Sequence, residues 1–143
     1  MSRTLVSLFL FLCVACAPDP GQLSPNEALR AFLTALDRSP HAPEQLKVAY
    51  DWLDTRSQTA LKQRAELAAS LAGRSIAAWD MLVAGRGSFS AYSVPSLRMR
   101  SRIEGERAFV TIPGEAQGEV EIPLVREQGR WRVVLGLAGE VRQ

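Results

Sequence analysis

The spacing of apolar residues changes from a helical period to a period of two near residue 88, and this change constrains the fold more than any other feature. Before it, apolar residues recur every three or four positions, as on one face of an α-helix. After it, apolar and polar residues alternate, as in strands with one buried face. Helices followed by an antiparallel meander predict an α+β domain, with N-terminal helices packed on one face of a curved antiparallel sheet of four or more strands.

The first predicted helix runs from Ser24 to Arg38. Ser24 is placed as the N-cap, Pro25 lies in the first turn, and Glu27 completes a capping box by reaching back to the cap. The expected buried face consists of four residues: Leu29, Phe32, Leu33 and Leu36.

Two further helices and a short segment follow. The second helix is predicted from Pro43 to about Asp54, and the third begins at Thr55, which with Gln58 forms another capping box, and ends at Gly73 as C-terminal cap. The expected apolar stripes are Leu46, Ala49, Tyr50 and Leu53 on the second helix and Leu61, Ala65, Ala68, Leu71 and Ala72 on the third. A short fourth segment is expected from Ile76 to Val83.

Four strands are predicted at about residues 95–103, 107–113, 118–126 and 130–137. Two-residue loops at Glu104–Gly105 and Gln128–Gly129 would fix the register. The predicted pairs are Leu97 with Ile112, Met99 with Val110, Ile112 with Val120, Ile122 with Leu135, and Leu124 with Val133. This parity places nearly all aliphatic residues on one face: Leu97, Met99, Val110, Ile112, Val120, Ile122, Leu124, Trp131, Val133 and Leu135.

The opposite face of the predicted sheet is rich in arginine and forms the candidate interaction surface: Arg98, Arg100, Arg102, Phe109, Arg132 and Val134. The register places Arg98 in one row with Glu121, whereas Arg102, Arg107 and Arg132 have no acid in theirs. Like charges directly opposite one another destabilise a sheet. The surface is therefore either a contact site, for a second copy or an acidic envelope protein, or a solvated face with arginine stems over Phe109 and Val134.

The N-terminal region has the pattern of a secretory signal. A single basic residue precedes the apolar run Leu5–Val14, which is too short to span a membrane. The run ends in Cys13-Val14-Ala15-Cys16, which resembles the bacterial lipobox, in which the cysteine after the cut is lipidated on its thiol. The resemblance implies that Cys16 is the lipid-attachment residue and the new N-terminus. Several acyl chains give stable anchoring to a membrane.

One position departs from the lipobox. Cys13 stands where the family usually has Leu, and an ordinary signal peptide cut after Ala15 or Ala17 is the alternative. Because Ala17 is not the Asp that signals inner-membrane retention, the resemblance implies the periplasmic face of the outer membrane. The predicted organisation is a lipoprotein signal peptide (1–15), a lipidated N-terminus and tether (16–23), one cone-like α+β domain (24–137) and a short tail (138–143).

The strand half also resembles a known superfamily. The segment Ile122-Pro-Leu-Val-Arg-Glu-Gln-Gly-Arg-Trp-Arg-Val-Val-Leu135 looks like the closing hairpin of the nuclear-transport-factor-2-like (cystatin-like) superfamily. Ala49-Tyr-Asp-Trp-Leu-Asp and Leu71-Ala-Gly-Arg-Ser-Ile-Ala-Ala-Trp-Asp-Met-Leu82 are similar to lipoproteins of unassigned role from soil delta-proteobacteria. The resemblance covers roughly residues 24–137. It implies a cone-shaped fold but not one activity, because this superfamily hosts enzymes, binding modules and assembly factors.

The composition limits the chemistry of the domain. No cysteine follows Cys16, and His41 is the only histidine and lies in a loop flanked by prolines, so no catalytic triad, metal site or cofactor is predicted. A net charge of +2 predicts no nucleic-acid partner. We therefore expect a membrane-anchored, non-enzymatic binding or interaction module. The alternatives are a small apolar ligand carrier and an isomerase- or dehydratase-like cone enzyme, whose candidate acid–base residues are Asp51, Asp54, Asp80, Tyr50 and Tyr92.

The lipobox resemblance makes a direct prediction about the mature N-terminus. Mass spectrometry of the protein from membranes is expected to show a chain that begins at Cys16 and carries acyl groups on that residue. An unmodified Cys16, or a chain that begins at Pro18, would contradict it.

Overall fold

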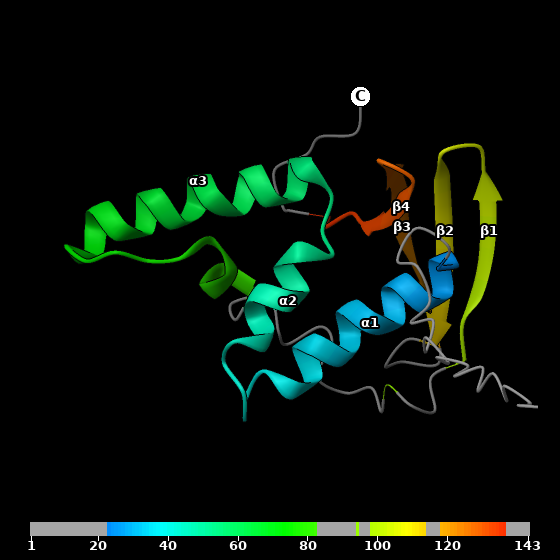
Figure 1. Cartoon of the computed structure of the whole chain (residues 1–143), viewed down its shortest axis with the longest axis horizontal. Helices are drawn as coiled ribbons and strands as arrows, with labels where there is room; N and C mark the ends of the chain where they lie inside the picture. The colour runs from blue at the N-terminus through cyan, green and yellow to red at the C-terminus, as the bar shows by residue number, and fades with distance from the viewer. Residues whose placement is uncertain (1–22, 83–93, 95–97, 114–117, 137–143) are drawn as a thin grey trace, which may run out of the picture.

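The computed structural model describes residues 23–82, 94, 98–113 and 118–136. Within them, three helices precede a four-stranded antiparallel sheet whose strand order follows the chain, β1-β2-β3-β4 (Figure 1). The elements are α1 (Pro25–Arg38), α2 (Gln45–Asp51), α3 (Thr55–Ala72), β1 (Arg100–Glu104), β2 (Arg107–Pro113), β3 (Glu119–Glu127) and β4 (Arg130–Val133). The predicted α+β class is confirmed. None of the described helices is both long and apolar enough to cross a membrane.

Helix α1 begins as predicted, with a reciprocal capping box. The Ser24 hydroxyl accepts the Glu27 backbone N–H at 3.3 Å, and the Glu27 carboxylate accepts the Ser24 backbone N–H at 2.7 Å. Donation from the backbone and the hydroxyl of Ser24 lowers the pKa of Glu27. The carboxylate therefore stays ionised at neutral pH and keeps the first turn of the helix capped.

The junction between α2 and α3 differs from the prediction. Helix α2 ends at Asp51, and the N-cap of α3 is Asp54, whose carboxylate accepts the Ser57 N–H at 3.2 Å. The predicted Thr55–Gln58 capping box is wrong, because Glu127 of β3 accepts the backbone N–H of Thr55 at 3.1 Å and its hydroxyl at 2.9 Å.

The same junction is joined to the sheet through Val133 of β4. Its N–H donates to the Trp52 carbonyl at 2.9 Å, and its carbonyl accepts the Asp54 N–H at 3.0 Å. Leu53 thus forms a parallel bridge with Val133. Because of this bridge, residues 52–54 are not helical, although the sequence predicted a helix to about Asp54. The helical half and the sheet half are consequently tied together by backbone hydrogen bonds.

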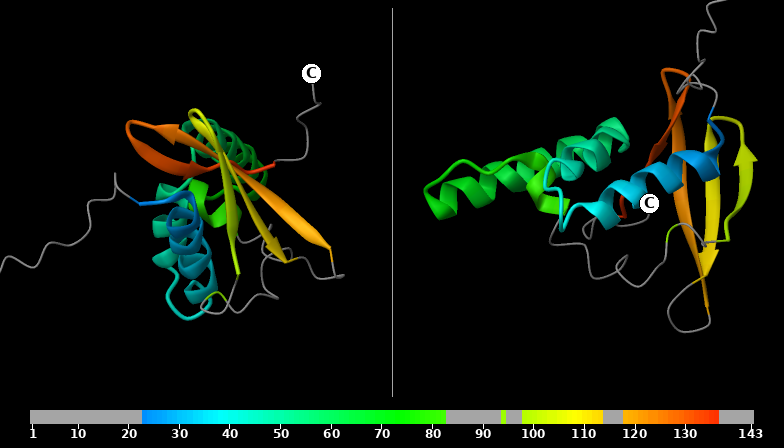
Figure 2. Two further views of the ribbon diagram at one scale, coloured as in Figure 1. Left: turned by 90° about the vertical axis from the view of Figure 1, so that its right-hand side faces the viewer. Right: turned by 60° about the horizontal axis from the view of Figure 1, so that its bottom comes forward.

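The core lies between α1 and the inner face of the sheet, with α2 packed against α1 (Figure 2). All four residues predicted for the buried face of α1 are buried, as are Leu46, Ala49 and Leu53 around α2. The predicted parity of the sheet is confirmed by Val110, Ile112, Ile122, Leu124, Trp131 and Val133, which are all buried. The prediction is wrong for Val120, which is 45% exposed near the start of β3. Leu97 lies outside the described residues.

Helix α3 starts beside β4 and extends away from the sheet (Figures 1 and 2). Its predicted stripe is buried at Leu61 and Ala65, but Leu71 is 83% exposed and Ala72 is also exposed. Gly73 caps the helix with φ 64°, as predicted. The expected segment Ile76 to Val83 is reduced to a 3₁₀ turn over residues 78–82, and Val83 lies outside the described residues.

The predicted register is confirmed for two of the three pairs of neighbouring strands, β2 with β3 and β3 with β4. Ile112 lies opposite Val120 and Leu124 opposite Val133, and the Gln128–Gly129 loop has positive φ at both residues, as a type I′ turn requires. The register of β1 against β2 is displaced by two residues from the prediction, because Gly105, with φ 61°, takes the first loop position instead of Glu104. A positive φ at that position suits glycine and strains other residues.

The pairing of Ile122 with Leu135 is also wrong. Strand β4 ends at Val133, and the Leu135 N–H donates to the Ser57 hydroxyl of α3 at 2.9 Å. The chain therefore leaves the sheet where α3 provides an alternative acceptor.

The two leucines of α3 provide a matched test of this fold. Leu61→Ala is expected to lower the free energy of unfolding by about 2–5 kcal/mol, because Leu61 is 2% exposed and its loss leaves a cavity. Leu71→Ala is expected to change it by less than about 0.5 kcal/mol. Urea unfolding followed by circular dichroism measures both values, and equal losses would contradict the projecting position of the end of α3.

Candidate functional site

The outer face of the sheet carries the candidate interaction surface, but the shifted register rearranges its rows. Arg100, rather than Arg98, lies in the row of Thr111 and Glu121. The next row contains Arg102, Phe109 and Pro123, and the third contains Glu104, Arg107, Val125 and Arg132. Each β1 arginine is thus placed one row away from the predicted position.

This rearrangement gives acidic neighbours to arginines that were expected to have none. Arg102 forms ion pairs with Glu104 and, at 3.2 Å, with Glu121, and its guanidinium lies 4.7 Å from the centre of the Phe109 ring. Arg100 is paired with Glu119. The predicted proximity of Arg98 and Glu121 is wrong. Exposed pairs of this kind contribute little to stability, but they neutralise the middle of the face.

The remaining arginines of the face have different surroundings. Arg98 and Arg107 are exposed, and neither side chain has a hydrogen bond or ion pair within the described ranges, although Glu104 lies opposite Arg107 and is paired with Arg102. Arg132 donates to the backbone carbonyl of Asp51 rather than to a carboxylate. Val134 is half-buried, and its N–H donates to the Pro123 carbonyl at 3.0 Å. Positive charge without a carboxylate partner is therefore found at the ends of the face.

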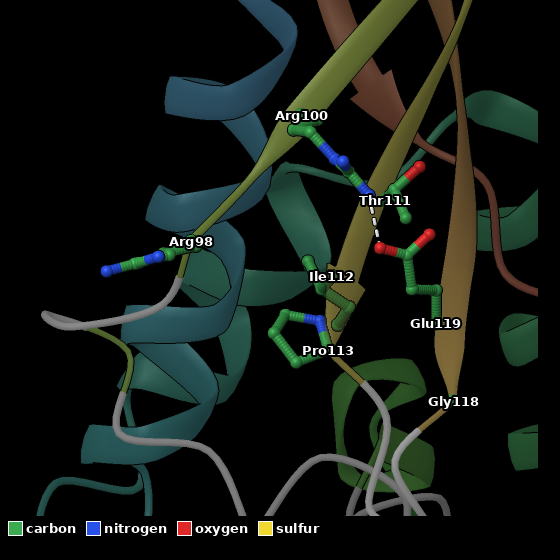
Figure 3. Close-up of a pocket in the computed structure, with 7 residues that line it drawn as sticks. All are labelled: Arg98, Arg100, Thr111, Ile112, Pro113, Gly118 and Glu119. Atoms are coloured by element: carbon green, nitrogen blue, oxygen red, sulfur yellow. Dashed lines mark hydrogen bonds and ion pairs between the residues drawn. The ribbon is translucent and has the colours of Figure 1, made fainter.

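A surface hollow of about 460 Å³ lies at one end of this face (Figure 3). It is lined by Arg98, Arg100, Thr111, Ile112, Pro113, Gly118 and Glu119. Figure 3 shows Arg100 directed across Thr111 toward Glu119, whereas Arg98 points away from them. The two arginines do not converge on one point, so the hollow is not built as a two-arginine clamp for an anion.

The candidate carboxylates of a cone enzyme have separate structural roles. Asp51 is exposed and paired with Lys47 at 2.9 Å, Asp54 is buried as the cap of α3, and Asp80 accepts the Ala77 N–H at 3.2 Å. The structure does not bring these three groups together in one site. Tyr92 lies outside the described residues.

The fourth acid–base candidate, Tyr50, is held as a neutral phenol. Its hydroxyl donates to the Gln58 carbonyl at 3.2 Å, and its ring meets that of Trp79 edge-on with centroids 6.2 Å apart. Burial, together with the charge of Asp51, raises the pKa of Tyr50. The phenol therefore stays protonated near neutral pH, and it is poorly suited to act as a general base.

His41 is exposed after α1, where its backbone N–H donates to the Arg38 carbonyl at 3.1 Å. No group of three potential metal ligands occurs among the residues that the structure describes. Cys16 lies outside them.

Comparison with known proteins adds no assignment to this geometry. No family model, curated protein or solved structure matches the chain.

Charge exchange tests the ion pairs of the outer face. Arg102→Glu is expected to lower the free energy of unfolding by about 1 kcal/mol, because it places a third carboxylate beside Glu104 and Glu121. Adding Glu121→Arg should restore part of this loss, as measured by urea unfolding at low salt. Arg98→Glu is the control, and a larger loss there than at Arg102 would favour the register predicted from sequence.

Proposed function

We propose that the chain is a bacterial envelope lipoprotein, anchored through Cys16 at the periplasmic face of the outer membrane, whose domain is a non-enzymatic interaction module. The lipobox-like segment before Cys16 supports the anchor. The outer face of the sheet is the proposed contact surface, because α1 and α2 pack on the other side (Figure 2). Its partner is an acidic envelope protein.

The distribution of charge on the outer face is the observation that carries the proposal. Arg100 and Arg102 are paired with glutamates, whereas the side chains of Arg98 and Arg107 form no ion pair in the described part of the chain. Glu104 lies opposite Arg107 but is paired with Arg102. An acidic partner would supply the missing carboxylates at the ends of the face. Half-buried Phe109 lies between them, half-buried Val125 lies beside Arg107, and both add apolar contact area.

The two alternative functions have less support. An acid–base enzyme needs groups that converge on a substrate, and Asp51, Asp54 and Asp80 are engaged in separate local contacts. An apolar ligand carrier needs internal space. The inner face of the sheet is instead covered by closely packed buried side chains, including Phe32, Ile112 and Leu124.

A photo-crosslinking residue introduced at Thr111 of the full-length protein tests the surface in the native envelope. We expect a crosslinked product with another protein, and none from the same residue introduced at Ser70 on α3. The combined substitution Arg98→Glu and Arg107→Glu is expected to weaken binding of that partner about tenfold, since like charges replace opposite ones.

The matched control is the combined substitution Lys62→Glu and Arg74→Glu. Both residues are exposed and lie outside the outer face. This variant should bind as the parent does. A crosslink only to a second copy of the chain would indicate that the surface forms a homodimer and does not bind an acidic partner. The absence of any product at Thr111, or equal weakening by both double variants, would refute the proposed surface.

A further inference from the structure

A second groove, of about 420 Å³, lies where α2, the start of α3 and β4 meet. These elements lie side by side in Figure 1. The groove is lined by Val48, Asp51, Trp52, Gln58, Arg130 and Arg132. Its volume is within the range of small-molecule sites.

Several contacts hold the walls of this groove in position. Trp52 is fixed by the hydrogen bond from Val133 to its carbonyl, and Arg132 is tied to α2 through the carbonyl of Asp51. The Gln58 side-chain amide donates to the carbonyl of Tyr50 at 3.0 Å and to that of Leu53 at 3.3 Å. The site is therefore largely formed before any ligand binds, which reduces the entropic cost of binding.

The charges that line the groove are unbalanced in favour of cations. Asp51 is already paired with Lys47. Glu127 lies opposite Arg130 across the hairpin, but its carboxylate accepts from the backbone and hydroxyl of Thr55. The side chain of Arg130 has no hydrogen bond or ion pair within the described residues, and the guanidinium of Arg132 donates to a carbonyl and not to a carboxylate. Two guanidinium groups thus line one groove without forming an ion pair within the described residues.

Apolar surface lies beside these cations. Trp52 is half-buried, so part of its indole is accessible, and Val48 is 42% exposed. Guanidinium groups recognise carboxylates in a planar, bidentate geometry, and an indole ring provides a flat surface for stacking.

We propose that this groove binds a small organic carboxylate with a planar apolar body. The carboxylate contacts Arg130 and Arg132, and the apolar body contacts Trp52 and Val48. Arg132 is shared with the outer face of the sheet, but the proposal goes beyond the protein-docking surface, because Val48 lies on α2 and Trp52 at its C-terminal end, and neither belongs to that face.

The test uses the full-length chain in detergent micelles and three probes. Phenylacetate has both the charge and the ring, phenylacetamide is its neutral analogue, and acetate has the charge alone. Binding is followed by the indole N–H signals in a ¹H–¹⁵N spectrum, with the Trp52 signal identified by its loss in Trp52→Phe. Phenylacetate is expected to shift that signal saturably with a Kd of about 1 mM, which is reasonable for so few atoms.

The probes and the variants can each support or contradict the proposal. Phenylacetamide and acetate should each bind at least about tenfold more weakly than phenylacetate, and Arg130→Gln should weaken phenylacetate about tenfold. Because the side chain of Arg130 has no hydrogen bond or ion pair within the described residues, its substitution should leave the melting temperature unchanged, so weaker binding would not reflect unfolding. Arg98→Gln, at the other end of the sheet, is the control and should bind phenylacetate normally.

The proposal is overturned if the Trp52 signal shows no saturable shift below about 20 mM phenylacetate. It is also overturned if the neutral amide binds as tightly as the acid, or if Arg130→Gln and Arg98→Gln behave alike. Loss of binding in Arg130→Gln with an unchanged crosslink at Thr111 would separate this groove from the protein-docking surface.

Discussion

The bridge between Leu53 and Val133 is the interaction on which the rest of the structure depends. Its two backbone hydrogen bonds join the α2–α3 junction to the last strand, across about eighty residues of sequence. The bridge ends α2 early, leaves Asp54 as the cap of α3, and fixes the direction in which α3 leaves the sheet. Both ends of the bridge are buried, so its hydrogen bonds are shielded from water.

The parity of the sheet was predictable, whereas part of its register was not. Alternation of apolar residues decides which face is buried, and Val110, Ile122 and Val133 are buried as their spacing requires. A displacement of two residues preserves that alternation, so periodicity cannot detect it. The glycine itself is the sequence signal that could have detected it. The first position of this turn has a positive φ, which Gly105 adopts more easily than Glu104.

The same displacement determines what could be predicted of the candidate site. The arginines of the outer face were identified correctly as a group, but their partners depend on register. Arg102 gains Glu121, which the predicted rows assign to Arg98, and Glu104, which was predicted to lie in the loop. The groove around Trp52 could not be predicted at all. It combines residues of α2 and its C-terminal end with Arg130 and Arg132 of β4, and that proximity arises from the Leu53–Val133 bridge, for which the local sequence contains no signal.

The proposed lipid anchor gives this architecture an orientation. Seven peptide units separate Cys16 from Leu23, so a lipidated Cys16 would keep the start of the domain within about 25 Å of the membrane surface. Helix α1 begins beside the sheet, where the Asn26 amide donates to the Met99 carbonyl at 3.5 Å, and the end of α3 lies at the opposite end of the molecule (Figure 1). The sheet would consequently lie nearer the membrane and the exposed Leu67 and Leu71 farther from it. An acidic envelope protein that meets Arg98 and Arg107 would therefore do so close to the bilayer, where the tether reduces the volume that the two partners must search.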